Sequence, residues 1–257
     1  MHTVTTIAAP LTLPVEHVVL LDDRGRASGL RAKADAHGPD TQLHLAFSCH
    51  VVRADGQVLV TRRAADKRTW PGVWTNACCG HPQLGETLGQ SVLRRLRQEL
   101  SVVPAAVGVA LPDFTYRATM DDGTVEHELC PVLVARVDDE PSLDPAEVDA
   151  VEWLPWDALV SRARTAPDTL SPWSVEQILR LADLAPSPAA WLETDAHRGA
   201  ALLAWHPGLE TPDSPGGLIS HPAGARPERR ATPVPGGGQG TATAPARVAG
   251  APADEPG

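Results

Sequence analysis

The spacing of apolar positions predicts a helix in the middle of the chain. Leu88, Val92, Leu96 and Leu100 recur every fourth residue, with Leu93 beside them. This period is typical of an amphipathic helix, so we predict one from Glu86 to Leu100. Its opposite, polar face carries Arg94, Arg95, Gln98 and Glu99.

Shorter apolar runs before this helix predict strands. Val18 to Leu21 is one such run. His44 to Val52 and Val58 to Arg62 flank Asp55-Gly56, a dipeptide that favours a tight turn between paired strands. We therefore predict a β-hairpin over these residues.

The second half predicts strands followed by helices. Thr124 to Val137 alternates and then becomes continuously apolar around Pro131, so we predict one strand with a bulge or an edge position there. Val148 to Trp153 predicts another strand. Two helices then begin with proline in the first turn, near Pro155 and at Ser171-Pro172, where Ser171 is the expected N-cap. This order predicts an α+β fold with strands around one central helix.

The two ends of the chain differ from the middle in composition. Residues 206–257 are rich in Pro, Gly, Ala, Thr and Arg, so we predict a disordered tail. Residues 1–14 contain no Lys or Arg and no apolar run of secretory length, and we expect a flexible start without a leader. The predicted domain therefore covers residues 15–205.

Net charge limits the partners of this protein. The 257 residues carry a formal charge of -10. Nucleic acid and anionic membranes attract clustered Lys and Arg, so we expect neither as a partner. An anionic ligand would need a local basic site.

Cysteine usage indicates a reducing compartment and a candidate site. The four cysteines are Cys49, Cys78, Cys79 and Cys130, and an adjacent pair does not suit a disulfide framework. We therefore expect free thiols and a cytoplasmic location. Within about twenty residues the chain also carries Cys79, His81 and Glu99, a density of reactive groups that indicates an active site.

One segment resembles the Nudix box, G-x5-E-x7-R-E-U-x-E-E-x-G-U. Gly80, Glu86, Arg94 and Glu99 occupy matching positions. The resemblance implies a Nudix-type fold with a mixed sheet between helices.

The departures from the box affect the expected chemistry. Arg95 and Gln98 stand where the box has carboxylates, and Ser101 replaces the closing glycine. Without those carboxylates the site is poorly equipped for metal-assisted attack of water on a diphosphate. It can still bind one.

Further motifs make the resemblance more specific. From Glu16 to Ile178 the chain resembles the type 1 isopentenyl-diphosphate isomerases, a Nudix-fold family. The matching motifs are His37 with His44, Thr61-Arg62-Arg63, Trp70-Pro71-Gly72-Val73-Trp74-Thr75-Asn76, Cys79-Gly80-His81-Pro82, Tyr116-Arg117-Ala118, Glu126-x-Glu128 and Ser171-Pro172-Trp173. The resemblance implies isomerisation of isopentenyl diphosphate to dimethylallyl diphosphate in isoprenoid synthesis.

The resemblance also assigns catalytic residues. Cys79 and Glu128 are the implied proton-transfer groups, with Tyr116 beside the carboxylate and Trp173 as the aromatic wall facing a carbocation at C3. Which of the two groups protonates the alkene is open, because each can carry or lose one proton.

A divalent-metal site is implied by three histidines and two carboxylates. The resemblance assigns His37, His44, His81, Glu126 and Glu128 to it. Because Glu126 and Glu128 are two apart on a predicted strand, both point to one face. Imidazole ligands favour Mn²⁺ or Zn²⁺, although Mg²⁺ is a third option if availability decides.

The resemblance implies a second ion and a basic site for the diphosphate. Glu99, together with the backbone carbonyl of Cys79, would bind Mg²⁺ on the diphosphate. The implied substrate-binding cations are Lys33, Arg63, Lys67 and Arg95. We expect a monomer or a weak homodimer.

Two other classes of function stand beside the isomerase. A Nudix hydrolase would release phosphate or a nucleoside monophosphate, but it would want the box carboxylates that Arg95 and Gln98 replace. A metal-binding or regulatory module without enzyme activity would keep its function after Cys79→Ala.

Overall fold

The computed structural model describes residues 15–192, which form two β-sheets and several helices. The predictions for residues 1–14 and 206–257 lie outside the described residues. The strands are β1 (His17–Leu21), β2 (Ala27–Ala32), β3 (His44–Leu45), β4 (Phe47–Val52), β5 (Gln57–Arg63), β6 (Trp74–Asn76), β7 (Cys78–Gly80), β8 (Ala106–Leu111), β9 (Thr115–Thr119), β10 (Val125–Leu129), β11 (Val132–Arg136) and β12 (Val148–Pro155). The helices are α1 (Leu88–Leu100), α2 (Trp156–Thr165), α3 (Pro172–Leu184) and α4 (Pro188–Trp191), with short 3-10 turns at Lys33–Asp35 and Pro167–Thr169.

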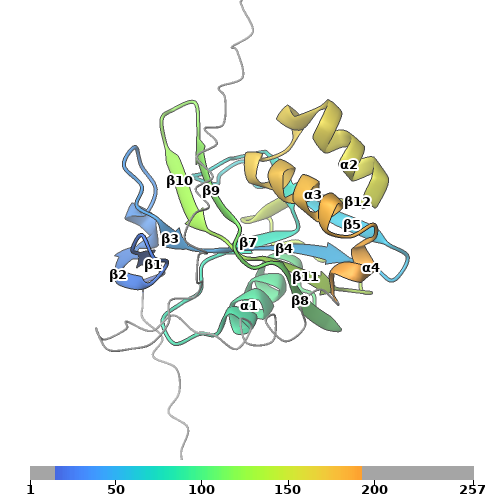
Figure 1. Ribbon diagram of the computed structural model, residues 1–257, viewed down its shortest axis with the longest axis horizontal. Coiled ribbons are helices and arrows are strands. Elements are labelled where there is room, and N and C mark those ends of the chain that lie inside the picture. The colour runs from blue at the N-terminus through green and yellow to red at the C-terminus, as the bar shows by residue number, and fades with distance from the viewer. Residues whose placement is uncertain (1–14, 193–257) are drawn as a thin grey trace, which may run out of the picture. The chain divides into compact units, whose positions relative to one another are not determined.

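The larger sheet lies between helices, with α1 on one face and α2 and α3 on the other (Figure 1). Its strand order is β12-β5-β4-β11-β8, with β6 and β7 paired to β5 and β4. Side chains alternate between the two faces, so Val134 of β11 packs in the core with Ile178 of α3, whereas Leu133 packs with Leu96 of α1. The predicted α+β fold with a mixed sheet between helices is confirmed.

The predicted single strand from Thr124 to Val137 is wrong. The segment forms β10 in the smaller sheet and β11 in the larger one, and Pro131, which has no N–H to donate, lies at the change. The segment from His44 to Val52 changes sheets in the same way at Ala46, and the two segments run parallel. The Ala46 N–H donates to the Leu129 carbonyl at 2.9 Å, so the paired segments cross between the sheets together.

The predicted central helix is confirmed, and two of its polar residues are buried. It begins at Leu88 after a capping box in which Thr87 and Gln90 satisfy each other's backbone N–H groups. Arg95 and Glu99, expected on the polar face, are only 5% and 6% exposed. They form an ion pair of 2.7 Å in the interior, so this face of the helix is not simply solvated.

The other confirmed predictions are the hairpin and the helix cap. β4 pairs antiparallel with β5 around Gly56, whose φ of 85° suits the tight turn. At the start of α3, the Ser171 hydroxyl accepts a hydrogen bond from the Ser174 N–H, as expected of an N-cap. Among residues 15–192 no helix is long and apolar enough to cross a membrane.

Candidate active site

Strand register brings the predicted catalytic and metal-binding residues together. In the smaller sheet β10 lies between β3 and β9, and Glu128 is directly opposite His44 on one side and Tyr116 on the other. His81 follows the end of β7, and His37 lies in the loop before β3. Residues from five segments of the chain therefore meet around one carboxylate.

His37, His44, His81 and Glu128, here called the histidine cluster, offer ligand atoms that all lie within 4.8 Å of one another. The Nε2 atoms of His37 and His44 are 3.3 Å apart. Glu128 Oε1 is 3.2 Å from His81 Nε2 and 3.4 Å from His44 Nε2. Three imidazole nitrogens converging on one carboxylate oxygen are a donor set that fits a divalent cation such as Mn²⁺ or Zn²⁺.

Hydrogen bonds orient His44 for this role. Its Nδ1 lies 2.9 Å from the Gln42 carbonyl, which can only accept, so Nδ1 carries the proton and the Nε2 lone pair faces the cluster. Burial lowers the pKa of His81 to about 4, which leaves its imidazole neutral near pH 7. Burial alone would raise the pKa of Glu128, but its contacts with the three histidines outweigh burial and hold that pKa well below its usual range. Burial disfavours the charged form of His44, but its contacts with Glu128 outweigh burial and raise the pKa of that imidazole. Metals bind the neutral imidazole and the ionised carboxylate, so binding at this cluster would release any proton that it holds.

Glu126 lies beside the histidine cluster rather than within its four ligand atoms. The Tyr116 hydroxyl is 2.9 Å from both Glu126 Oε2 and Glu128 Oε2. Burial and the neighbouring charge of Glu128 raise the pKa of Glu126. Because a phenol has one proton to donate, Tyr116 links two carboxylates that compete for it.

Cys79 lies on β7, opposite Ser48 of β4. Its Sγ is 3.5 Å from the Ser48 hydroxyl oxygen and accepts a hydrogen bond from Asn76 Nδ2 at 3.2 Å. Burial raises the pKa of Cys79 to about 11, although the bonds to Ser48 and Asn76 work in the opposite direction. The thiol therefore carries its proton at neutral pH in the free protein.

Trp173 lies in the first turn of α3, where the Ser171 cap fixes the start of the helix. The indole is 2% exposed, and its ring centroid is 5.5 Å from that of Tyr116. Its Nε1–H donates to Asn76 Oδ1 at 3.1 Å. The ring is thus held next to the pair of carboxylates.

All eight predicted catalytic and substrate-binding residues line one cavity of about 510 Å³, which we call the active-site cavity. A volume of this order suits a small organic ligand. The predicted catalytic residues among them are Cys79, Tyr116, Glu128 and Trp173, and the predicted substrate-binding cations are Lys33, Arg63, Lys67 and Arg95.

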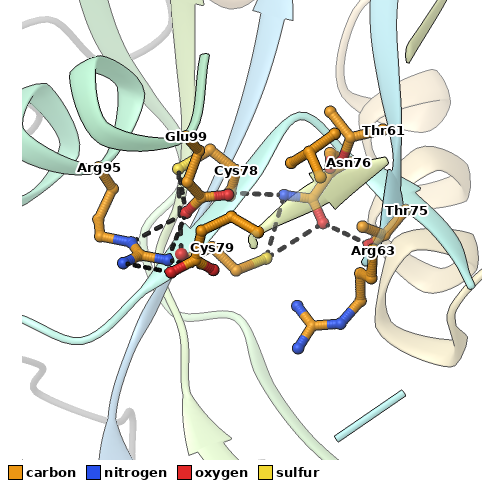
Figure 2. Close-up of a pocket in the computed structure, with 10 residues that line it drawn as sticks. Thr61, Arg63, Thr75, Asn76, Cys78, Cys79, Arg95 and Glu99 are labelled. Atoms are coloured by element: carbon orange, nitrogen blue, oxygen red, sulfur yellow. Dashed lines mark hydrogen bonds and ion pairs between the residues drawn. The ribbon is translucent and has the colours of Figure 1, made fainter. Parts of the chain in front are cut away.

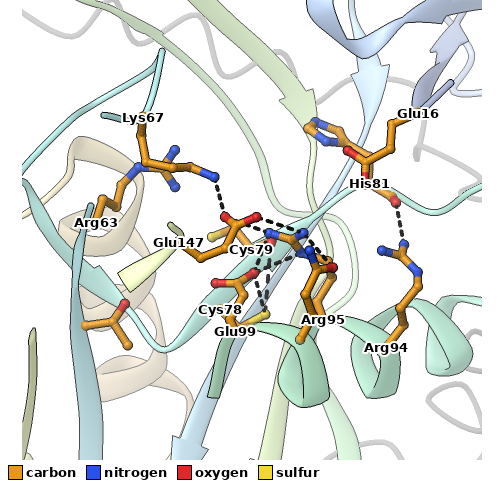
Figure 3. Close-up of polar contacts among 12 residues, drawn as sticks. Glu16, Arg63, Lys67, Cys78, Cys79, His81, Arg94, Arg95, Glu99 and Glu147 are labelled. Atoms are coloured by element: carbon orange, nitrogen blue, oxygen red, sulfur yellow. Dashed lines mark hydrogen bonds and ion pairs between the residues drawn. The ribbon is translucent and has the colours of Figure 1, made fainter. Parts of the chain in front are cut away.

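Lys67 and Arg95 share the carboxylate partner Glu147 (Figure 3). Lys67 pairs with Glu147, and Arg95 bridges Glu99 at 2.7 Å and Glu147 at 3.2 Å. Burial alone would raise the pKa of Glu147, but the charges of Arg95 and Lys67 lower it to about 2. We call Lys67, Arg95, Glu99 and Glu147 the basic cluster.

The remaining two cations are also engaged. Lys33 forms an ion pair of 2.7 Å with Glu16. Arg63 donates to the Thr69 carbonyl at 2.9 Å, which ties it to the loop after β5.

A second, small cavity of about 20 Å³ lies beside Glu99 (Figure 2). Glu99 and Cys79, the residues expected to bind the second ion, both line it. Cys78 Sγ donates to Glu99 Oε1 at 3.4 Å. Burial raises the pKa of Glu99, with Arg95 acting against it. This volume has room for a single water-sized occupant, which is compatible with one small hard cation.

Sequence reasoning missed several residues that contact the predicted ones. Gln177 donates to the Ser48 hydroxyl at 2.9 Å, behind the Cys79 thiol. Gln177 follows Trp173 by four residues, so its place on the same helix face could have been inferred. Neither Ser48 nor Glu147 carries any signal in its spacing, because only strand and loop packing bring them to the site.

A family model and a solved structure show which class of protein this chain belongs to. A model of the NUDIX domain family matches residues 42–175. A crystal structure of DR0079 from Deinococcus radiodurans has the same fold, with a TM-score of 0.52 and 22% identity, over 65% of this chain and 99% of that one. The fold and the site therefore define a NUDIX-domain protein.

Curated relatives give the particular family. An isopentenyl-diphosphate Delta-isomerase of Saccharopolyspora erythraea is 45% identical over 70% of this chain and 93% of its own length. One of Frankia alni is 53% identical over 63% of this chain and 84% of its own length, and one of Cutibacterium acnes is 50% identical over 64% and 86%. The chain belongs to the isopentenyl-diphosphate Delta-isomerase family of enzymes.

Proposed function

We propose that this enzyme interconverts isopentenyl diphosphate and dimethylallyl diphosphate by moving protons at the two ends of an allylic system. The observation that carries the proposal is the active-site cavity, which a thiol, a buried carboxylate, an indole and four cationic side chains line together. The names of the curated relatives support this substrate pair.

The reaction needs two proton-transfer groups. A proton added to C4 of isopentenyl diphosphate places positive charge at C3, and loss of a proton from C2 then forms the new double bond. Cys79 and Glu128 supply these groups, and they exchange roles in the reverse direction. Each can carry or lose one proton, so either can be the donor without upsetting the balance.

Aromatic residues stabilise the charge that develops at C3. The Trp173 ring lines the cavity, and a desolvated cation–π contact is worth about 2 kcal/mol, or on the order of thirtyfold in rate. The Tyr116 hydroxyl is within hydrogen-bond distance of Glu128 and orients that carboxylate.

A metal ion at the histidine cluster would orient Glu128, and cationic side chains bind the diphosphate of the substrate. A divalent cation bound by His37, His44, His81 and Glu128 would fix that carboxylate and bias its protonation. Lys33, Arg63, Lys67 and Arg95 bind the diphosphate, and Glu99 binds the Mg²⁺ ion that accompanies it.

The decisive experiment is incubation with isopentenyl diphosphate, Mg²⁺ and Mn²⁺ in D₂O, followed by NMR. We expect dimethylallyl diphosphate with deuterium in a methyl group. Unchanged substrate would overturn the proposal, and released phosphate would indicate a hydrolase instead.

We also propose that the enzyme acts in the cytoplasm. Cys49, Cys78, Cys79 and Cys130 are all free, which supports a reducing compartment. Fractionation of cells that produce the tagged protein would test this, and recovery outside the cytoplasm would contradict it.

A further inference from the structure

We propose that Asn76 is a positioning residue, which fixes the Cys79 thiol and the Trp173 indole relative to each other through one buried amide. This inference rests on the proposed function, because it assigns Asn76 to the geometry of that reaction. The Asn76 side chain lines the small cavity beside Glu99 and not the active-site cavity, which it affects through Cys79 and Trp173.

The orientation of the Asn76 amide follows from its partners. The indole Nε1–H can only donate, so the atom 3.1 Å from it is the amide oxygen. The Cys78 and Cys49 carbonyls can only accept, so the atom at 2.8 Å and 3.2 Å from them is the amide nitrogen. The side chain is fully buried, and a flip would mismatch all three of these contacts in the interior.

The same amide contacts the thiol from both of its polar atoms (Figure 2). Asn76 Nδ2 is 3.2 Å from Cys79 Sγ, and Oδ1 is 3.3 Å from it. The two N–H groups of Nδ2 are shared among the sulfur and the Cys49 and Cys78 carbonyls, and the thiol in turn donates to Oδ1, the atom that also binds Trp173. One oxygen therefore sets the direction of both side chains.

The indole plane has no other polar anchor among the contacts described for residues 15–192. Trp70 meets the Trp173 ring edge-on, with centroids 5.5 Å apart and planes at 82°, and Tyr116 lies at 5.5 Å and 32°. Ring contacts of this kind tolerate sliding, whereas a hydrogen bond fixes the rotation of the indole. A cation–π contact requires the ring face to point at the charge, so this rotation bears on the rate.

Asn76 is itself held from the backbone side. It ends β6, where it is opposite Val60 of β5, and the Thr61 hydroxyl donates to its carbonyl oxygen at 3.0 Å. The amide thus connects the central sheet to the first turn of α3. A residue in this place can transmit the rigidity of the sheet to the two groups.

The test combines a double-mutant cycle with a spectroscopic signature. Asn76→Ala should lower kcat about 100-fold, because small misplacements of reacting groups have effects of that order. The Kd for inorganic diphosphate should not change when it is measured without Mg²⁺, because Asn76 lines the small cavity expected to hold that ion. In a Trp173→Phe background, which lacks the indole N–H, the loss caused by Asn76→Ala should be much smaller.

Protein labelled with 5-fluorotryptophan gives a readout that needs no turnover. The ¹⁹F resonance that disappears in Trp173→Phe belongs to residue 173, and Asn76→Ala should shift or broaden it. Ser91→Ala, which removes buried hydrogen bonds on α1, is the matched control and should leave it in place. If Asn76→Ala does not fold, Asn76→Ser leaves a smaller void and tests the same bonds.

An unshifted resonance, or additive losses in the cycle, would overturn the positioning role. A wild-type protein that does not isomerise the substrate would instead overturn the proposed function. The fluorine measurement would still report on the contact between Asn76 and Trp173, so the two failures are distinguishable.

Discussion

The histidine cluster and the basic cluster stand beside the same cavity but balance their charges in opposite ways. In the histidine cluster, three imidazoles surround Glu128, and one ligand atom from each of the four residues lies within 4.8 Å of the others. In the basic cluster, Arg95 and Lys67 already form ion pairs with Glu99 and Glu147. We expect a cation to complete the first arrangement, and in the second a bound diphosphate would have to compete with Glu99 and Glu147 for the same cations. We therefore expect the histidine cluster to bind an additional cation and the basic cluster to replace carboxylate contacts with diphosphate contacts.

The largest expected effect comes from removing the proton-transfer groups, which should lower kcat without weakening diphosphate binding at the basic cluster. Glu128→Gln and Cys79→Ala should each lower kcat by on the order of 10⁴-fold, because proton transfer fails. Diphosphate affinity, measured by calorimetry with Mg²⁺, should remain largely intact, because the basic cluster is untouched. Glu176→Gln on the exposed face of α3 is the control. Equal losses of rate and affinity would show that proton transfer and diphosphate binding do not depend on separate groups of residues.

Metal removal should affect the histidine cluster next most strongly. An ion present at about 100 times its Kd contributes about 2.7 kcal/mol to the free energy of unfolding, so a chelator should lower Tm by several degrees. Mn²⁺ should restore Tm in the wild type and in His127→Ala. It should fail to do so in His44→Ala, since that side chain belongs to the cluster. A normal Mn²⁺ response from His44→Ala would remove the cluster as the metal site.

Competition between Glu147 and the diphosphate for Lys67 predicts a smaller effect, which is a gain in diphosphate affinity rather than a loss of activity or stability. Glu147→Gln frees Lys67 from its ion pair, so inorganic diphosphate should bind on the order of threefold to tenfold more tightly. Titration calorimetry with Mg²⁺ measures this, and Glu176→Gln again corrects for the loss of one charge. Weaker binding by Glu147→Gln would mean that Glu147 organises the cations rather than competing for them.

The pH dependence of stability is the smallest expected effect. The pKa of Glu147 is about 2 in the folded protein, against an ordinary value of 4.5. Because the folded value is depressed, its contribution is complete above about pH 4.5 and is lost as pH falls toward 2. Urea unfolding at pH 5 and pH 3 should show a steeper loss in the wild type than in Glu147→Gln. Parallel losses would indicate that this ion pair adds nothing to stability.

Local patterns predicted the elements whose signal is local. The four-residue spacing of Leu88 to Leu100 predicted α1, and Ser171 before Pro172 predicted the start of α3. The short strands β6 and β7 were missed, because three residues show no period. At Pro131 the pattern predicts a bulge or an edge position, since a sequence does not show that a strand leaves one sheet for another.

The candidate site shows the same limit. The motifs identified Cys79, Tyr116, Glu128 and Trp173, and all four line the active-site cavity. They gave no role to Glu147, whose partners come from α1 and from the loop after β5.

The sequence by itself determined which reactive side chains are present, their order in the motifs and the family to which they point. Only the tertiary structure decided that the Arg95–Glu99 pair, four residues apart on one helix, is buried and that Asn76 joins Cys79 to Trp173. The reason is physical. Spacing along the chain determines which residues share a helix or strand face, whereas a contact between Asn76 and a helix 97 residues later depends on how sheets and helices pack.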